Sequence, residues 1–306
     1  MKYFFAIWLL VSSAHAFAQI TYETVYVDYD SAWQYKNLKI IPIRQKKKPE
    51  GPPSNIISLS QALNSGLATV TERGTASTEN VHWLRINNNS NKSILINSGE
   101  IISGGRQDRM MMHDTILSPS EKDQYVQVMC VEEGRWSDKE KKLIYSNFAN
   151  PRLRKVLDEN KNQVLIWKEI DNQLQQGGFR SQTNEYLSRT IDKKPTSFGE
   201  EYFNFFREKF KNSDSTIVGF VAMSGNRIIG SDIYAETNLF YSQLEPLLRG
   251  YTDEAAYFGA PVSVPEKSVK EYMDKILTDE QTQQEFVSKN GKIFRHNGRV
   301  IHINTF

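Results

Sequence analysis

The residues best suited to chemistry lie in two short segments, GEIISGGRQDR at residues 99–109 and CVEEGRW at residues 130–136. Both segments combine carboxylates and arginines with glycines. An arginine side chain presents two parallel donors that match two oxygens of a phosphate or carboxylate. Glycine lets the backbone adopt positive φ or approach a ligand closely. We therefore predict a ligand-binding site built from Gly104, Gly105, Arg106, Gln107, Arg109, Arg135 and Trp136.

The same segments supply candidates for acid or base chemistry. The carboxylates are Glu100, Glu132 and Glu133, and His113 follows the first segment closely. A carboxylate or histidine near a bound ligand could act as a general acid or base. The alternative is a structural network in which arginines and carboxylates neutralise one another around a tight turn. Arginines that open into a shared cleft beside an unpaired carboxylate would favour a site. If Arg106, Arg109 and Arg135 are each paired with an internal carboxylate instead, the site hypothesis fails both for a binding module and for an enzyme.

Other reactive residues show no catalytic or metal-binding spacing. Cys130 alternates with Val126 and Val128, a pattern typical of a small buried side chain. The histidines after residue 18 form neither H-x-x-x-H nor H-E-x-x-H, so no metal site is predicted. The chain has no G-x-S-x-G and no phosphate-binding P-loop motif, and no cofactor is predicted.

The N-terminus predicts export. Lys2 precedes an apolar run at residues 3–11, and Ala16-Phe17-Ala18 offers a cleavage site, so residues 1–18 read as a signal peptide cut after Ala18. As a helix the apolar run would measure about 13 Å, less than half of a membrane core of about 30 Å. The mature protein is therefore expected to be periplasmic or secreted. No membrane span is predicted, and no lipid anchor, because the only cysteine is Cys130.

Charge and length exclude some functions and leave others open. The formal net charge of +2 indicates no general attraction to nucleic acid or to an anionic membrane. A chain of 306 residues is long enough to bury a large core without disulfides. Nothing in the sequence indicates an oligomeric state.

The elements that must position the site follow from periodicity. A strand is expected at residues 38–43, before a proline- and glycine-rich linker. Residues 56–136 then read as a mostly antiparallel β unit, with NNNSN at residues 87–91 as a hairpin turn. Strand candidates lie at residues 66–72, 81–87, 93–97, 100–103, 111–117 and 125–131.

The second half is more helical. Asn150 and Pro151 begin a helical pattern that continues to Gly177, and another helix is expected at residues 200–211. Further helices are expected at residues 238–249, ending at Gly250, and 266–277. Hairpins are expected at residues 216–233, around Ser224-Gly225-Asn226, and at the C-terminus, around Asn297-Gly298.

The sequence thus predicts an α+β fold, with a β-rich antiparallel N-terminal half, a helical middle and a mixed hairpin and helix C-terminal part. We divide the chain into the signal peptide at residues 1–18, an N-terminal strand and linker at residues 19–55, and a single domain at residues 56–306.

The two central segments together resemble the signature of a family of bacterial domains, the ADP-ribosylglycohydrolase- and rhodanese-phosphatase-superfamily-associated protein domain. LSQALNSGLATVTE at residues 59–72 and VGFVAMSGNRIIGSDIY at residues 218–234 resemble other parts of it. The resemblance extends from about residue 56 to residue 306. Asp108 departs from the family pattern, where asparagine is expected. The resemblance implies a phosphorylated or nucleotide-sugar-like ligand, because the family is associated with enzymes that process ADP-ribose.

Three functions remain in competition. The first is a binding or interaction module for an anionic small molecule or a partner protein. The second is a hydrolase acting on a phosphorylated or ADP-ribosyl-type substrate. The third is a structural envelope protein without a small ligand. We rank the binding module first, because no catalytic motif stands out.

Overall fold

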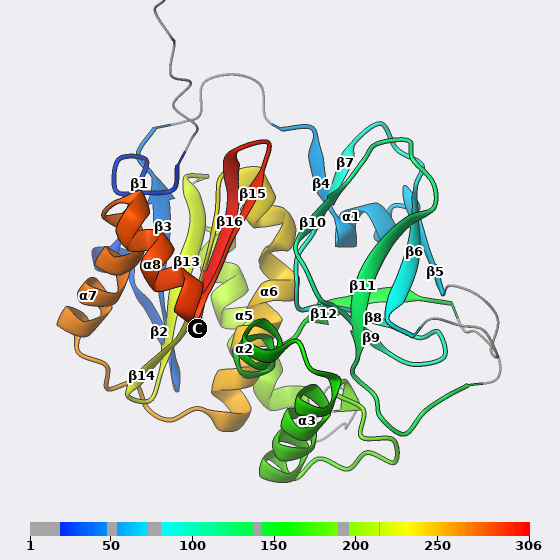
Figure 1. Ribbon diagram of the computed structural model, residues 1–306. Helices are drawn as coiled ribbons and strands as arrows, with labels where there is room; N and C mark the ends of the chain where they lie inside the picture. Colours follow the sequence, from blue (N-terminus) through cyan, green and yellow to red (C-terminus); the bar gives the residue numbers. More distant parts are fainter. Residues whose placement is uncertain (1–18, 48–53, 73–80, 138–141, 189–195, 214) are drawn as a thin grey trace, which may run out of the picture.

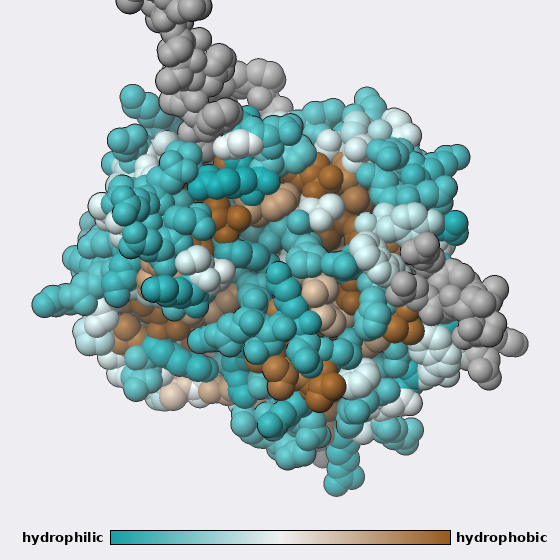
Figure 2. All heavy atoms as spheres, viewed as in Figure 1, coloured by the Kyte–Doolittle hydropathy of each residue, from teal (hydrophilic) through white to brown (hydrophobic). Residues whose placement is uncertain are grey.

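The computed structural model describes residues 19–47, 54–72, 81–137, 142–188, 196–213 and 215–306. The predicted signal peptide lies outside this part of the chain. The α+β prediction is confirmed. A seven-stranded sheet with helices on both faces packs beside a unit of two smaller sheets, and two helices lie below the junction (Figure 1). The face shown in Figure 2 is mostly hydrophilic, and its hydrophobic areas form separate patches.

The seven-stranded sheet joins both ends of the chain. Its order is β1-β3-β13-β14-β16-β15, with β2 also paired to β3. All of these pairs are antiparallel, so the strands near the N-terminus extend the sheet made by the two C-terminal hairpins. Both predicted hairpins are confirmed, and Asn297 and Gly298 adopt the positive φ that the second turn requires. The strands are β1 (Val25–Val27), β2 (Trp33–Tyr35), β3 (Leu38–Gln45), β13 (Ile217–Ser224), β14 (Arg227–Tyr234), β15 (Gly291–His296) and β16 (Arg299–Thr305).

Helices cover both faces of this sheet because alternate strand residues are apolar on each side. Phe220 and Ala222 of β13 face the aromatic helices α5 and α6, while Val221 and Met223 face α7 and α8. The short 3-10 helix η1 (Tyr29–Ser31) lies between β1 and β2. The helices are α5 (Thr196–Lys211), α6 (Thr237–Phe258), α7 (Glu266–Leu277) and α8 (Glu280–Asn290).

The predicted end of α6 at Gly250 was wrong, since the helix continues for two more turns to Phe258. Gly250 is buried, and a Cβ there would lie 2.8 Å from the carbonyl oxygen of Ala149. This glycine therefore permits close packing against the chain before α2 and does not end the helix.

The β unit contains two sheets, ordered β10-β7-β4 and β12-β8-β9-β11-β6-β5. Every pair is antiparallel except β4 with β7. Helix α1 (Leu59–Asn64) begins with a capping box formed by Ser58 and Gln61. The strands are β4 (Ile56–Ser58), β5 (Ala68–Glu72), β6 (Trp83–Asn88), β7 (Ser93–Ile96), β8 (Glu100–Ser103), β9 (Arg109–Met111), β10 (Thr115–Leu117), β11 (Gln124–Cys130) and β12 (Ile144–Phe148).

Two expectations for the β unit were wrong in detail. The run at residues 111–117 is divided between β9 and β10, which belong to different sheets. The segment at residues 87–91 does not join a hairpin, because β6 and β7 also lie in different sheets. Its bend is held by Asn88, whose side chain donates hydrogen bonds to the carbonyl oxygens of Lys92 and Ser118.

The helical middle is two helices where the sequence predicted one. α2 (Pro151–Asn160) begins at the predicted Asn150 cap, and α3 (Gln163–Gly177) follows after a break. Lys161 adopts a φ of 45°, and the side chain of Asn162 caps the second helix by accepting from the backbone N–H groups of Val164 and Leu165. No helix in the described part of the chain is both long and apolar enough to cross a membrane.

A buried charge network joins the β unit, α2 and the large sheet. Arg154 of α2 donates two hydrogen bonds, of 2.9 and 2.7 Å, to Asp232 of β14. His302 of β16 lies 2.9 Å from Asp232 and 3.7 Å from Asp114 of the β unit. Lys292 of β15 pairs with Asp114 at 3.1 Å. These pairs fix how the two halves of the molecule meet.

Candidate functional site

Three chain segments meet beside the end of β11: the turn after β8, the segment after β11 and the loop after α3. Cys130 pairs with Arg109, and the N–H of Val131 donates to the carbonyl oxygen of Asp108 at 3.0 Å. Glu132 and Glu185 form an antiparallel β-bridge that attaches the third segment. The two motif segments therefore lie in contact, and the contact arises through the pairing of β9 with β11.

The first segment turns sharply at Gly104 and Gly105, with φ of 101° and 53°. Residues that carry a side chain rarely adopt these backbone φ values. A Cβ on Gly104 would also lie 2.3 Å from the carbonyl oxygen of Lys142. The N–H of Gly104 donates to Oδ1 of Asp108 at 2.8 Å. The glycine turn thus orients the Asp108 carboxylate.

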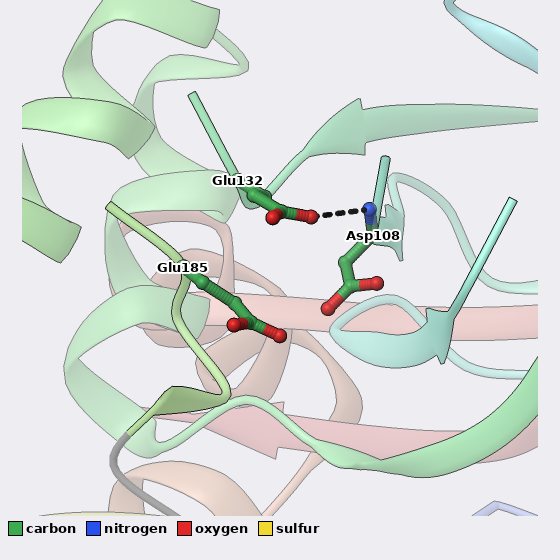
Figure 3. Close-up of side chains that lie close together, drawn as sticks. All are labelled: Asp108, Glu132 and Glu185. Atoms are coloured by element: carbon green, nitrogen blue, oxygen red, sulfur yellow. Dashed lines mark hydrogen bonds between the residues drawn. The ribbon is translucent and has the colours of Figure 1, made fainter. Parts of the chain in front are cut away.

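Three carboxyl groups converge at this point, those of Asp108, Glu132 and Glu185 (Figure 3). One oxygen from each lies within 4.8 Å of the others. Both oxygens of Glu132 accept hydrogen bonds, Oε1 from the Thr183 hydroxyl at 2.8 Å and Oε2 from the N–H of Asp108 at 3.4 Å. In contrast, Oδ2 of Asp108 is buried without a hydrogen-bond donor among the described residues.

Among the residues that the structure describes, one cation lies inside this cluster. Nη2 of Arg135 is 2.6 Å from Glu132 Oε2 and 3.0 Å from Asp108 Oδ1. Three carboxyl groups against one guanidinium leave an excess of negative charge. Accordingly, burial and the neighbouring carboxylates of Asp108 and Glu132 raise the pKa of Glu185 to about 7. Burial and Glu132 also raise the pKa of Asp108, against the opposing effects of the Gly104 N–H and Arg135.

The cluster forms part of the wall of a pocket of about 940 Å³. Pockets that bind small molecules range from about 300 to 1,000 Å³. Arg180 lines this pocket, is exposed, and has no ion pair with any residue in the described part of the chain. Five side-chain hydroxyls also line it, from Ser103, Ser146, Ser181, Thr183 and Ser188.

The other two predicted arginines lie outside the pocket lining and face a buried carboxylate, Glu72. The ion-pair distances from Glu72 are 3.4 Å to Arg109 and 3.7 Å to Arg106. Gln107 connects the Glu72 ion pairs with the carboxyl cluster. Its side chain accepts a hydrogen bond from Arg109 and donates one to the carbonyl oxygen of Glu132. Because Arg106, Arg109 and Arg135 are all paired with carboxylates, none is an open anion clamp.

The remaining candidates also lie outside the pocket lining. Glu100 is fully buried and accepts from the Tyr145 hydroxyl at 3.0 Å, and burial raises its pKa to about 8. Burial, and then Lys161, lower the pKa of His113, which is half-buried. Glu133 is exposed and accepts from Asn184. The exposed Trp136 ring faces the Arg106 guanidinium at 6.0 Å.

Of the predicted residues, Gly104, Glu132 and Arg135 line the pocket. The sequence prediction missed Glu185 and Arg180, which lie in the loop after α3. The signal that could have found them is the polar run RSQTNE at residues 180–185, which follows directly after a helix end. The burial predicted for Cys130 is confirmed, and its Sγ lies 3.4 Å from Nη1 of Arg109.

A family model described as the ARG and Rhodanese-Phosphatase-superfamily-associated Protein domain matches residues 26–306. The match confirms the predicted family and begins earlier than the resemblance did, so that it includes the β3 strand of the large sheet. No curated protein and no solved structure matches the chain.

Proposed function

The chain belongs to the ARG and Rhodanese-Phosphatase-superfamily-associated Protein domain family, and we propose that its pocket binds a hydroxyl-rich ligand that carries an anionic group, such as a nucleotide sugar. The observation that carries this proposal is the composition of the pocket wall. Carboxylates and five residues with side-chain hydroxyls line one pocket together with Arg180, which has no ion pair in the described part of the chain.

Each part of the wall suits one part of such a ligand. Carboxylate oxygens and serine or threonine hydroxyls accept hydrogen bonds from sugar hydroxyls. The guanidinium of Arg180 can donate two parallel hydrogen bonds to a phosphate. Because the three arginines of the motif segments are paired with carboxylates, Arg180 replaces them in this proposal as the residue that contacts the anion.

The test is a calorimetric titration of the full mature chain with ADP-ribose and with UDP-glucose. We expect at least one of them to bind, and we expect Arg180→Ala to weaken that binding about 10- to 100-fold, because a charge-assisted hydrogen bond contributes about 1.5–3 kcal/mol. Arg299→Ala is the matched control, since Arg299 is also exposed but lies in the C-terminal hairpin. Equal affinity in Arg180→Ala and the wild type would contradict the proposal.

Hydrolysis is a second candidate function, supported by the position of Glu185. This carboxyl group is only half-buried and lines the pocket, so it can reach a bound ligand, as a group that exchanges protons with a ligand must. It also lies beside Asp108. The same mixtures should be analysed for products. Turnover that is lost in Glu185→Gln while binding remains would establish an enzyme, whereas stable binding without products would establish a binding module.

We also propose that the mature protein begins at Gln19 and acts outside the cytoplasm. The signal peptide pattern supports this, and the folded body extends to the predicted cleavage point. The Gln19 side chain donates to Glu280 at 3.0 Å, and Ile20 is buried. Mass spectrometry of protein purified from the producing cell should give a chain that starts at Gln19. An intact chain starting at Met1 would overturn the proposal.

A further inference from the structure

We infer that Asp108, Glu132 and Glu185 hold a hard divalent cation of the Ca²⁺, Mg²⁺ and Mn²⁺ class, and that this cation forms part of the pocket wall. The inference deepens the proposed function and rests on it for the role of the cation. It gives the acidic wall a way to accept an anionic ligand, because a bound cation would neutralise the carboxylates and face the pocket.

The donor set points to a hard cation. All three side chains offer carboxylate oxygens, and the Thr183 hydroxyl that contacts Glu132 adds another oxygen. Oxygen ligands without imidazole or thiolate favour Ca²⁺, Mg²⁺ or Mn²⁺ over zinc or copper.

The spacing allows one cation to contact all three carboxyl groups. One oxygen from each carboxyl group lies within 4.8 Å of the others. Three oxygens at such separations lie no more than about 2.8 Å from a common point, and Ca–O bonds measure about 2.3–2.6 Å. Small shifts of the side chains would therefore bring all three groups into contact with one cation.

A second observation, independent of the clustering, also calls for a ligand. The Asp108 side chain is 2% exposed, and its Oδ2 has no N–H or hydroxyl donor among the described residues. The Glu185 carboxyl group lies within hydrogen-bonding reach of Asp108 and can donate to it only while protonated. The other oxygen of Asp108 is fully engaged by the Gly104 N–H and by Arg135. An unpaired buried carboxylate oxygen is costly. In Figure 3 the Asp108 carboxyl group points towards the space that it shares with Glu185.

Arg135 does not remove the need for a cation. It lies on one side of the cluster, at Asp108 Oδ1 and Glu132 Oε2. Arg135 does not contact Oδ2 of Asp108, and the described contacts of Arg135 do not include an ion pair with Glu185. Arg135 lowers the pKa of Glu185, but burial and the carboxylates of Asp108 and Glu132 outweigh this effect. A divalent ion bound at Asp108 Oδ2 and Glu185 would complete the neutralisation that Arg135 begins.

The test is a titration of the full mature chain, stripped of metal, with CaCl₂ alone at fixed ionic strength. We expect one saturable site per chain. Asp108→Asn keeps an acceptor for the Gly104 N–H but removes a charge, and Glu185→Gln alters a half-buried side chain that tolerates substitution. Each should weaken Ca²⁺ binding at least about tenfold, because affinity follows the number of charged ligands. Glu121→Gln, an exposed acid in the loop before β11, should leave it within twofold.

Circular dichroism and urea unfolding without Ca²⁺ establish that each variant is folded before its affinity is compared. If Asp108→Asn does not fold, Glu185→Gln alone decides. Absence of saturable Ca²⁺ binding, or equal affinity in the wild type and Glu185→Gln, would overturn the inference.

An ADP-ribose titration in EDTA and in Ca²⁺ separates this inference from the proposed function. Saturable Ca²⁺ binding without any ligand binding would support the cation site and remove the proposed ligand. Ligand binding that is equal in EDTA and in Ca²⁺, together with no Ca²⁺ binding, would keep the proposed function and remove the cation.

Discussion

Glu132 and Glu185 lie directly opposite each other in an antiparallel β-bridge, although both carry carboxyl groups. Like charges at opposite positions destabilise a β pair. The Asp108 carboxylate adds a third negative group, and Arg135 compensates only part of the charge. Local arrangements that lower stability are expected at functional sites, where they are kept for binding or chemistry.

The first prediction concerns this repulsion. Glu185→Gln should raise the free energy of unfolding by about 0.5–1 kcal/mol at pH 8 in EDTA, because it removes one of the opposed charges. Urea unfolding measures the change, and Glu121→Gln serves as the control, with an effect within about 0.5 kcal/mol. A loss of stability in Glu185→Gln would show that the bridge is a structural pair and that its charges do not repel.

The second prediction separates structural arginines from the arginine at the pocket. Arg109→Met should lower the free energy of unfolding by about 3–5 kcal/mol, because it breaks a buried ion pair with Glu72. Arg180→Ala should lower it by less than about 0.5 kcal/mol, because Arg180 is exposed. Comparable losses in the two variants would contradict the division of roles.

The elements around the site were more predictable than its chemistry. Apolar alternation located β6 and β11, and asparagine with glycine marked the last hairpin, because these signals depend on nearby residues. The break at Lys161 and the continuation of α6 through Gly250 depend on contacts made elsewhere in the fold.

The site shows the same division. The two motif segments were found from their glycines and charges. The partner of Arg106 and Arg109 could not be read from the sequence, because Glu72 lies outside both segments. Arg135 pairs with Asp108 and Glu132 inside the segments, which is the internal neutralisation that the sequence left open as an alternative.

The third prediction uses the buried Glu100. Burial raises its pKa from 4.5 to about 8, so the folded state holds a proton that the unfolded state releases. The contribution of Glu100 to the free energy of unfolding is therefore greatest below about pH 4.5 and falls as the pH rises to about 8. The fall is on the order of 5 kcal/mol, at about 1.4 kcal/mol per pH unit. Glu100→Gln should remove this slope in urea unfolding between those pH values, and an unchanged slope would contradict the assignment.

The fourth prediction concerns His302, in the network between the two halves. Burial lowers its pKa, but hydrogen bonds with Asp114 and Asp232 outweigh burial, so the pKa is raised overall. A raised pKa gives stability that is present below the unfolded value of 6.5 and lost as pH rises through the folded value. His302→Gln should therefore cost about 2–4 kcal/mol at pH 5.5 and less at pH 9.5. An equal cost at both pH values would show that the ring is neutral throughout.

The most direct test of the account is the location of a cation in crystals of the mature chain soaked in MnCl₂, read from anomalous difference density. Mn²⁺ shares the oxygen preference of Ca²⁺ and Mg²⁺. The account predicts the strongest peak among the carboxylates of Asp108, Glu132 and Glu185. Peaks only at other acidic residues, with none within bonding distance of Asp108, would contradict it.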